Sequence, residues 1–188
     1  MDSMSLANRI TLARAALIPL PVVLLLTGNR TAAAVSFLVI SAGDVLDGLV
    51  ARARGEVTTL GKALDPAVDK ALYLSVVWAL AVSGGLPWWL AALFTLPQLA
   101  LGLGAWILHA RVRLVQGARA LGKATATLTF LSTLMLVAPL PPEPAAWARI
   151  GFAVALTLTY VATLDYGLSA LRALRLKRRG GQGTPLGQ

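Results

Sequence analysis

Residues 44–69 read DVLDGLVARARGEVTTLGKALDPAVD, and they hold four aspartates, Asp44, Asp47, Asp65 and Asp69. These four are half of the 8 acidic residues in a chain of 188. On both sides of this stretch the chain consists mainly of long uncharged, apolar runs. An interpretation of the fold and the function has to explain why an apolar chain has four acids in this stretch.

The composition is typical of a protein embedded in a membrane. Hydrophobic residues make up 57% of the chain and charged residues only 13%, whereas soluble domains carry about 25% charged residues. Apolar runs separated by turn residues predict an all-α integral membrane bundle, with a hairpin turn at 83–87. One domain, residues 1–175, should contain all the spans, and we expect a basic, disordered tail at 176–188. The six predicted membrane-spanning helices are about 10–27, 31–53, 62–82, 87–108, 120–138 and 147–170.

The basic residues predict the orientation of the bundle. If both termini and the loops at 52–62 and 109–123 lie on one side, that side holds 15 of the 17 Lys and Arg residues. Because an excess of Lys and Arg marks the cytoplasmic face, both termini should be cytoplasmic. These charges lie beside membrane spans, so we expect membrane lipids and no nucleic acid as partners. The absence of cysteine excludes disulfides and thiolate chemistry.

The spacing of the four aspartates indicates a metal site. An aspartate at the centre of a spanning helix costs about 2.5–3.5 kcal/mol, so acids inside a membrane are functional candidates by default. Asp44 and Asp47 share a helix face at i, i+3, and Asp65 and Asp69 share one at i, i+4. Two antiparallel helices would bring the pairs to the same depth, where oxygen ligands suit hard divalent cations. A helix cap at Asp65-Pro66 or a turn at Asp47-Gly48 explains single acids, but not all four.

The same stretch resembles the signature of the CDP-alcohol phosphotransferases. That pattern is D-x2-D-G-x2-A-R-x8-G-x3-D-x3-D, and all eight of its fixed positions are present between Asp44 and Asp69. The family resemblance implies transfer of a phosphatidyl group from CDP-diacylglycerol to an alcohol acceptor, with release of CMP. It also implies two divalent cations, Mg²⁺ or Mn²⁺, and it admits a homodimer.

The resemblance implies roles for individual residues. Asp44, Asp47, Asp65 and Asp69 would hold the two metals, and Asp69 would also be the catalytic base. The CDP-lipid would be bound by residues of the signature and of an N-terminal stretch, Asn8-x2-Thr11-x2-Arg14, that is similar to the opening of phosphatidylglycerophosphate and cardiolipin synthases. For Asn8 and Arg14 we leave open a cap and an arginine that reaches the lipid headgroups. The predicted CDP-lipid contacts are Asn8, Thr11, Gly48, Ala51, Arg52 and Gly61.

The acceptor is indicated by the second predicted cytoplasmic loop. Its cations suit a phosphorylated alcohol because arginine makes strong, directional bonds to phosphate, and topology anchoring is the alternative explanation. The resemblance favours glycerol 3-phosphate, since Gly122-Lys123 is similar to the G-K of phosphatidylglycerophosphate synthases, although the sequence that follows departs from their pattern. The predicted acceptor-binding residues are Arg111, Arg113, Arg119 and Lys123.

Other readings stay open. Within the class, the product could be that of a cardiolipin, phosphatidylinositol-phosphate or phosphatidylserine synthase. Outside it, a membrane prenyltransferase also uses Asp-rich motifs, Mg²⁺ and a diphosphate, and a divalent-cation transporter also holds acids within the membrane. The position of the acids near one end of two spans favours the phosphotransferase. We expect the protein in the bacterial inner membrane, with the active site facing the cytoplasm.

Overall fold

The computed structural model describes residues 6–54, 59–112 and 120–180, and the side chains of residues 10–43, 65–100, 122–165 and 167–169. Within these ranges all regular secondary structure is helical, which confirms the all-α prediction. The helices are α1 (Leu6–Leu17), α2 (Pro19–Leu26), α3 (Arg30–Arg54), α4 (Thr59–Val82), α5 (Trp88–Val112), α6 (Ala120–Val137) and α7 (Pro142–Gly180).

The first predicted span is two helices rather than one. The break falls at Ile18, between α1 and α2. Pro19 and Pro21 follow directly, and neither has a backbone N–H to donate to the carbonyl four residues earlier. Pro19 instead occupies the first position of α2, where a missing N–H is tolerated and the fixed φ of proline favours a helix.

The last helix is longer than predicted at both ends. It begins at Pro142 and ends at Gly180, whereas the apolar pattern predicts 147–170. Pro142 is an N-terminal helix signal, and the basic segment after residue 170 is rich in Leu, Ala, Arg and Lys, which are good helix formers. The helix therefore includes residues 176–180, which the sequence analysis assigned to a disordered tail, and residues 181–188 lie outside the described ranges.

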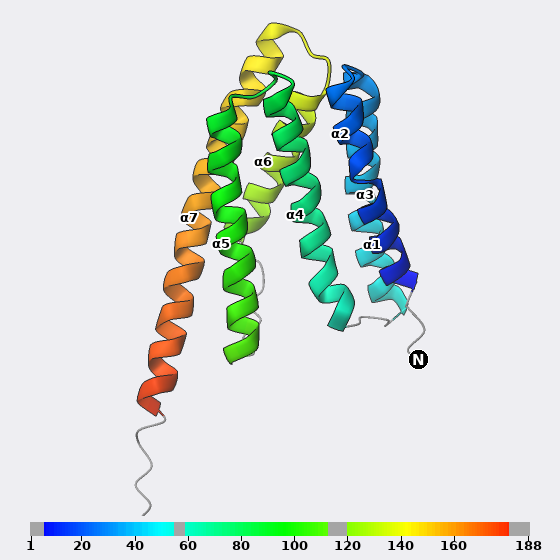
Figure 1. Ribbon diagram of the computed structural model, residues 1–188. Coiled ribbons are helices and arrows are strands. Elements are labelled where there is room, and N and C mark those ends of the chain that lie inside the picture. Colours follow the sequence, from blue (N-terminus) through cyan, green and yellow to red (C-terminus); the bar gives the residue numbers. More distant parts are fainter. Residues whose placement is uncertain (1–5, 55–58, 113–119, 181–188) are drawn as a thin grey trace, which may run out of the picture.

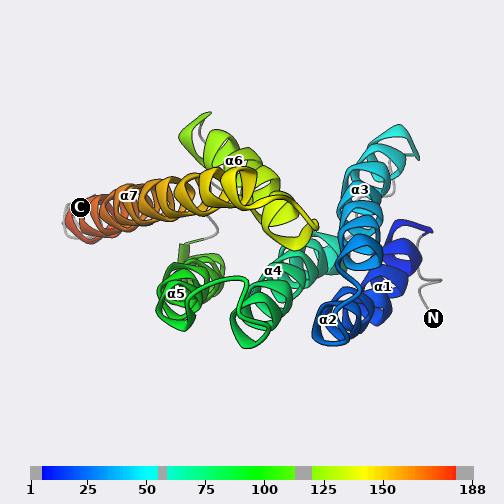
Figure 2. The same ribbon diagram turned by 90° about the horizontal axis from the view of Figure 1, so that it is seen from above.

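The helices run roughly parallel to one axis (Figure 1). The segment α1–α2 runs toward the upper end, and from α3 onward the direction alternates from one helix to the next. The start of α1 and the end of α7 lie at the same, lower end, and the α2–α3, α4–α5 and α6–α7 connections lie at the upper end. Seen from above, α1, α2 and α3 gather on one side and α5, α6 and α7 on the other, with α4 between them (Figure 2). The α1–α2 segment packs against both α3 and α4. Within the described parts of the chain, α3 and α4 pack far less extensively against each other.

The upper end is closed by turns and helix caps. Gly28 and Gly84 adopt positive φ angles of 82° and 76°, which glycine reaches without steric penalty. The amide of Ala32 donates to Asn29 Oδ1 at 3.2 Å, which caps the start of α3. Arg30 Nε donates to the carbonyl of Val137 at 3.3 Å, and its Nη2 donates to that of Leu136. Arg30 thus supplies donors to the last carbonyls of α6 and ties α3 to that helix.

Aromatic rings join the helices in the core. Phe37 of α3 lies 5.6 Å from Tyr73 of α4 and 5.9 Å from Phe130 of α6, measured between ring centroids. Phe94 of α5 lies 5.4 Å from Phe152 of α7. These separations are in the range in which aromatic pairs attract each other beyond their buried area. These pairs therefore join α3 to both α4 and α6, and they join α5 to α7.

The outer surface of the bundle is strongly apolar. Val82, Trp88 and Trp147 are more than two-thirds exposed, and many other large apolar side chains are about half exposed. Among the described residues, one helical stretch, Pro142–Ser169, is long and apolar enough by length and composition to cross a membrane. Four shorter apolar helical stretches accompany it, Ile10–Leu26, Arg30–Gly43, Trp88–Ala100 and Gly122–Val137.

Candidate active site

The four aspartates lie on two helices, α3 and α4, whose acid-bearing ends are at the same end of the bundle. Asp44 and Asp47 are in the last three turns of α3, and Asp65 and Asp69 are in the first three turns of α4. The two helices run in opposite directions, as the sequence analysis requires (Figure 1). Asp65 and Asp69 are both partly buried. The side chains of Asp44 and Asp47 lie outside the described residues, so the meeting of the four carboxylates stays a prediction.

A hydrogen bond from α1 holds Asp65. Thr11 is buried, with 1% of its surface exposed, and its Oγ1 donates to Asp65 Oδ1 at 2.8 Å. A hydrogen bond from a hydroxyl to a carboxylate is charge-assisted and stronger than a neutral one. The hydroxyl hydrogen of Thr11 is thus directed at one of the predicted metal ligands, a contact that the sequence analysis did not anticipate.

Arg14 lies one turn after Thr11 and is also inside the protein. Only 4% of its surface is exposed, and its Nε donates to the backbone carbonyl of Ile40 on α3 at 3.0 Å. Gly43 leaves room for this side chain, because a Cβ at that position would lie 3.1 Å from Arg14 Cδ. Arg14 therefore does not extend to the lipid headgroups, which was one of the two interpretations of this residue.

Lys70 is a charged residue of the site that the sequence analysis did not single out. It follows Asp69 directly on α4 and is partly buried. Its Nζ donates to the carbonyl of Gln98 on α5 at 3.4 Å. A lysine in an apolar run next to a predicted metal ligand is the signal that could have identified it. Its observed role is to link α4 to α5.

For most of the remaining predicted site residues, the structure gives only the position of the backbone. Lys123 is exposed near the start of α6. Asn8 lies on α1, Gly48, Ala51 and Arg52 on α3, Gly61 on α4 and Arg111 on α5, and their side chains are outside the described residues. Arg113 and Arg119 lie outside the described ranges altogether. The predicted CDP-lipid and acceptor contacts of these residues therefore stay predictions.

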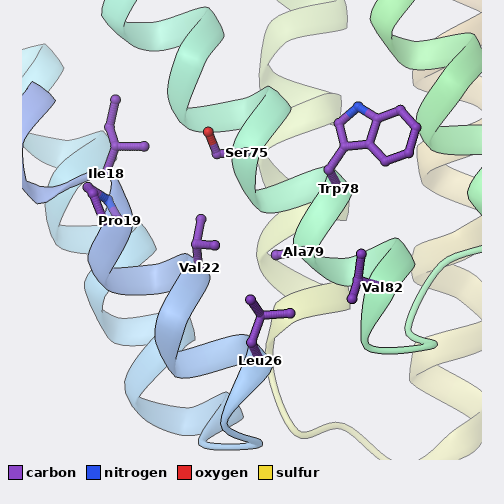
Figure 3. A pocket seen from close by; sticks show the side chains of 8 residues that line it. All are labelled: Ile18, Pro19, Val22, Leu26, Ser75, Trp78, Ala79 and Val82. Carbon is purple, nitrogen blue, oxygen red and sulfur yellow. The ribbon is translucent and has the colours of Figure 1, made fainter.

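An apolar groove lies between α2 and α4 (Figure 3). On α4 its lining residues follow the acids in sequence, toward the α4–α5 turn. Its volume is about 390 Å³. The lining is aliphatic except for Ser75 and the indole of Trp78, and it contains no charged residue. Ser75 is six residues after Asp69, about 9 Å along the helix. The groove is suited to hydrocarbon and unsuited to a charged group such as a diphosphate. Its lining residues are Ile18, Pro19, Val22, Leu26, Ser75, Trp78, Ala79 and Val82.

The donor set at the acid-bearing end fits divalent cations such as Mg²⁺ and Mn²⁺. All four predicted ligands are carboxylates, and these hard oxygen donors are what such ions prefer. Asp65 uses Oδ1 to accept the bond from Thr11. A carboxylate held in this way resembles a metal ligand oriented by a second hydrogen-bonding partner.

Comparison with known proteins identifies the family. A family model described as CDP-alcohol phosphatidyltransferase matches residues 4–161. A protein of Mycobacterium tuberculosis named "Probable phosphatidylglycerophosphate synthase" is 32% identical over 176 residues, which cover 89% of this chain and 82% of the relative. The "CDP-diacylglycerol--glycerol-3-phosphate 3-phosphatidyltransferase" of Bacillus subtilis is 29% identical over 189 residues, 91% of this chain and 97% of the relative.

A third relative matches over a shorter length. It is a Mycobacterium tuberculosis protein provisionally named a cardiolipin synthase, and it is 36% identical over 87 residues, 46% of this chain and 42% of the relative. The family match includes both acid-bearing helices and all eight fixed positions of the signature. The resemblance on which the sequence analysis relied is thereby confirmed: the chain belongs to the CDP-alcohol phosphatidyltransferase family and is a transferase enzyme.

Proposed function

We propose that the protein is a membrane-embedded enzyme of phospholipid biosynthesis that transfers a phosphatidyl group from CDP-diacylglycerol to glycerol 3-phosphate and releases CMP. The observation that carries this proposal is the family match across both acid-bearing helices. The acceptor is supported by two relatives, each aligned over most of this chain, whose names specify phosphatidylglycerophosphate synthesis.

Two divalent cations, Mg²⁺ or Mn²⁺, would complete the site. Asp44, Asp47 and Asp65 would hold them, and Asp69 would complete the second position. When bound, such ions neutralise the diphosphate and stabilise the charge that develops during displacement at phosphorus. The bond from Thr11 to Asp65 supports this assignment, because metal-binding carboxylates are themselves hydrogen-bonded.

The chain's own residues would bind the nucleotide and move one proton. Gly48, Ala51, Arg52 and Gly61 would surround the CDP group, together with Asn8 of α1. The acceptor hydroxyl oxygen forms a bond to the phosphorus that bears the diacylglycerol, and the bond from that phosphorus to the bridging oxygen breaks. CMP leaves with the bridging oxygen and its electron pair. Asp69 takes the hydroxyl proton, as a general base within hydrogen-bond reach can do.

The phosphate of the acceptor would be held by cations where α5 ends and α6 begins. Lys123 is exposed there, and Gly122 beside it has open space around its Cα. Exposure leaves the ammonium group free to meet a charged substrate from the aqueous side. Arg111, Arg113 and Arg119 are the other proposed contacts, and guanidinium groups suit a phosphate dianion.

A membrane setting is supported by the apolar outer surface and by the candidate span Pro142–Ser169. The start of α1 and the end of α7 lie at one end of the bundle (Figure 1). We assign this end, which holds the acids and most of the basic residues, to the cytoplasmic side of a bacterial inner membrane.

The reaction is tested with purified protein, CDP-diacylglycerol and Mg²⁺ or Mn²⁺, by measuring CMP release and identifying the lipid product by mass spectrometry. Glycerol 3-phosphate should support turnover and yield phosphatidylglycerophosphate. The matched acceptors are phosphatidylglycerol, inositol phosphate and serine. Turnover with one of these alone would reassign the acceptor, and no CMP with any acceptor from a folded sample would refute the enzyme as proposed.

The orientation is tested by labelling single cysteines, since the natural chain has none. Ser83→Cys lies in the α4–α5 turn, and Thr184→Cys lies in the C-terminal tail. In intact spheroplasts a membrane-impermeant maleimide should label the first variant only, and it should label both after permeabilisation. The reverse order of labelling would contradict the assignment.

A further inference from the structure

We propose that Thr11 and Arg14 of α1 act together as a clamp that sets the separation of the acid-bearing ends of α3 and α4, so that both are positioning residues for the metal site. The clamp deepens the proposed function, on which its role in metal binding rests. It also changes the role expected for Thr11, from a contact with the CDP-lipid to a residue that acts through Asp65.

One arm of the clamp reaches α4. The Oγ1 of Thr11 donates to Asp65 Oδ1 at 2.8 Å, across 54 residues of sequence. Thr11 is fully buried on the inner face of α1. The bond fixes the rotation of the Asp65 carboxylate and leaves its second oxygen, Oδ2, for another partner. A hydrogen bond to a ligand carboxylate is the usual means by which proteins orient metal ligands.

The other arm reaches α3. Arg14 is at i+3 from Thr11, so the two side chains lie on the same side of α1. Its Nε donates to the Ile40 carbonyl at 3.0 Å, and its aliphatic part passes Gly43, which directly precedes Asp44. Burying a guanidinium group costs free energy unless hydrogen bonds compensate. Arg14 therefore holds the segment of α3 that leads into the acids.

The packing explains why such a clamp is needed. Among the residues that the structure describes, the helices α3 and α4 make few contacts with each other, whereas α1 packs extensively against both. Over these residues, direct packing between α3 and α4 contributes little to the spacing of the two helices. A metal site requires its ligands to stay within about 0.5 Å of the productive geometry. The two bonds from one turn of α1 can provide that precision.

The Thr11 arm is tested by Mn²⁺ binding to the full-length protein in lipid nanodiscs, followed by electron paramagnetic resonance without CDP-lipid or acceptor. Thr11→Val keeps the shape of the side chain but removes its donor, and it should weaken Mn²⁺ affinity about tenfold or more. Thr11→Ser keeps the hydroxyl and should restore most of that affinity. Leu12→Met, on the exposed face of the same helix, is the matched control and should bind as the natural chain does.

Steady-state kinetics separate positioning from substrate contact. If Thr11 acts through Asp65, Thr11→Val should lower kcat and leave the KM for CDP-diacylglycerol within about twofold. A nucleotide contact predicts the opposite, a raised KM with kcat retained, and that result would overturn the assignment. Thr11→Ala provides the same comparison if the valine variant does not fold.

The Arg14 arm is tested by distances between spin labels. Ala42→Cys on α3 and Ala71→Cys on α4 are exposed positions, and the chain has no other cysteine. Arg14→Met keeps the aliphatic stem but removes the guanidinium group, so it should lengthen or broaden the α3–α4 distance distribution. A reference pair between α4 and α5, Ala71→Cys with Leu96→Cys, should not change.

The outcomes distinguish the clamp from the proposed function. Natural-like Mn²⁺ affinity in Thr11→Val, or an unchanged α3–α4 distance in Arg14→Met, overturns the clamp. If the natural chain releases no CMP but both variants respond as stated, the clamp stands and the proposed reaction fails. If the natural chain binds no Mn²⁺, the metal assignment fails and the distance measurement alone decides whether α1 spaces the two helices.

Discussion

Tyr160→Phe tests a bond that compensates for a proline inside a helix. Pro97 lies in the interior of α5 and has no N–H to donate to the carbonyl of Leu93, four residues earlier. The hydroxyl of Tyr160 on α7 donates to that same carbonyl at 2.8 Å. The tyrosine thus replaces the missing donor and joins the two helices. Removing its hydroxyl deprives the Leu93 carbonyl of this bond.

The expected loss of stability follows from the nature of the bond. A typical intramolecular hydrogen bond contributes about 0.5–1.5 kcal/mol, and bonds between membrane helices average about 0.6 kcal/mol in double-mutant cycles. In the proposed membrane setting, the surrounding hydrocarbon would offer no water to replace the lost donor. We therefore expect Tyr160→Phe to lower the free energy of unfolding by about 1 kcal/mol.

A double-mutant cycle isolates this mechanism from a general packing effect. Pro97→Ala restores an N–H at position 97 that can donate to the Leu93 carbonyl, so in that background Tyr160→Phe should cost about half as much or less. Equilibrium unfolding in mixed detergent micelles, followed by circular dichroism, measures all four chains. Equal costs of Tyr160→Phe in the two backgrounds would refute the reasoning, because the tyrosine would then not be substituting for the proline.

Other variants test packing and chemistry at single positions. Gly151→Ala would place a Cβ 2.8 Å from Ser132 Oγ between α7 and α6, and such overpacking should lower the free energy of unfolding by about 1–3 kcal/mol. Gly167→Ala, on the same helix, would place a Cβ with nothing within 4 Å of it and should instead raise the free energy of unfolding by about 0.5–1 kcal/mol. The same detergent unfolding assay compares the pair, and equal effects would contradict the close approach at Gly151. Asp69→Asn should lower kcat by about 10²–10⁴-fold while CDP-diacylglycerol binding, measured by calorimetry, is largely kept; unchanged turnover would remove Asp69 as the base.

The positions of most helices could be predicted because apolar run length and turn residues determine them. The prediction of 31–53 differs by one residue at each end from α3, and 120–138 differs by one residue from α6. The turn predicted at 83–87 is also confirmed. Predictions of helix ends from apolar runs were wrong where an apolar run is not one continuous helix or where a helix continues beyond the apolar run. Pro19 breaks a continuous apolar run, and the basic segment after residue 170 continues a helix without being apolar.

The site was predictable where local spacing carries the information. The signature specifies which acids lie on which helix and on which face, and the structure places Asp65 and Asp69 one turn apart on α4. Sequence spacing did not show the partners of these residues, because they lie far away along the chain. Thr11 and Asp65 are 54 residues apart, and Arg14 and Ile40 are 26 apart.

Arg14 shows why an N-terminal helix can matter to a site whose ligands it does not supply. Judged by sequence alone, an arginine near the start of a span is expected at the headgroups, since burying its charge is unfavourable. Its burial becomes understandable once Gly43 leaves space for its stem and Ile40 offers a carbonyl. The same turn of α1 also holds Asp65 through Thr11. The buried Arg14 contacts α3 and Thr11 contacts α4, so both acid-bearing helices are positioned relative to α1. The N-terminal stretch and the acid signature therefore act as one unit, although 29 residues of sequence lie between Arg14 and Asp44.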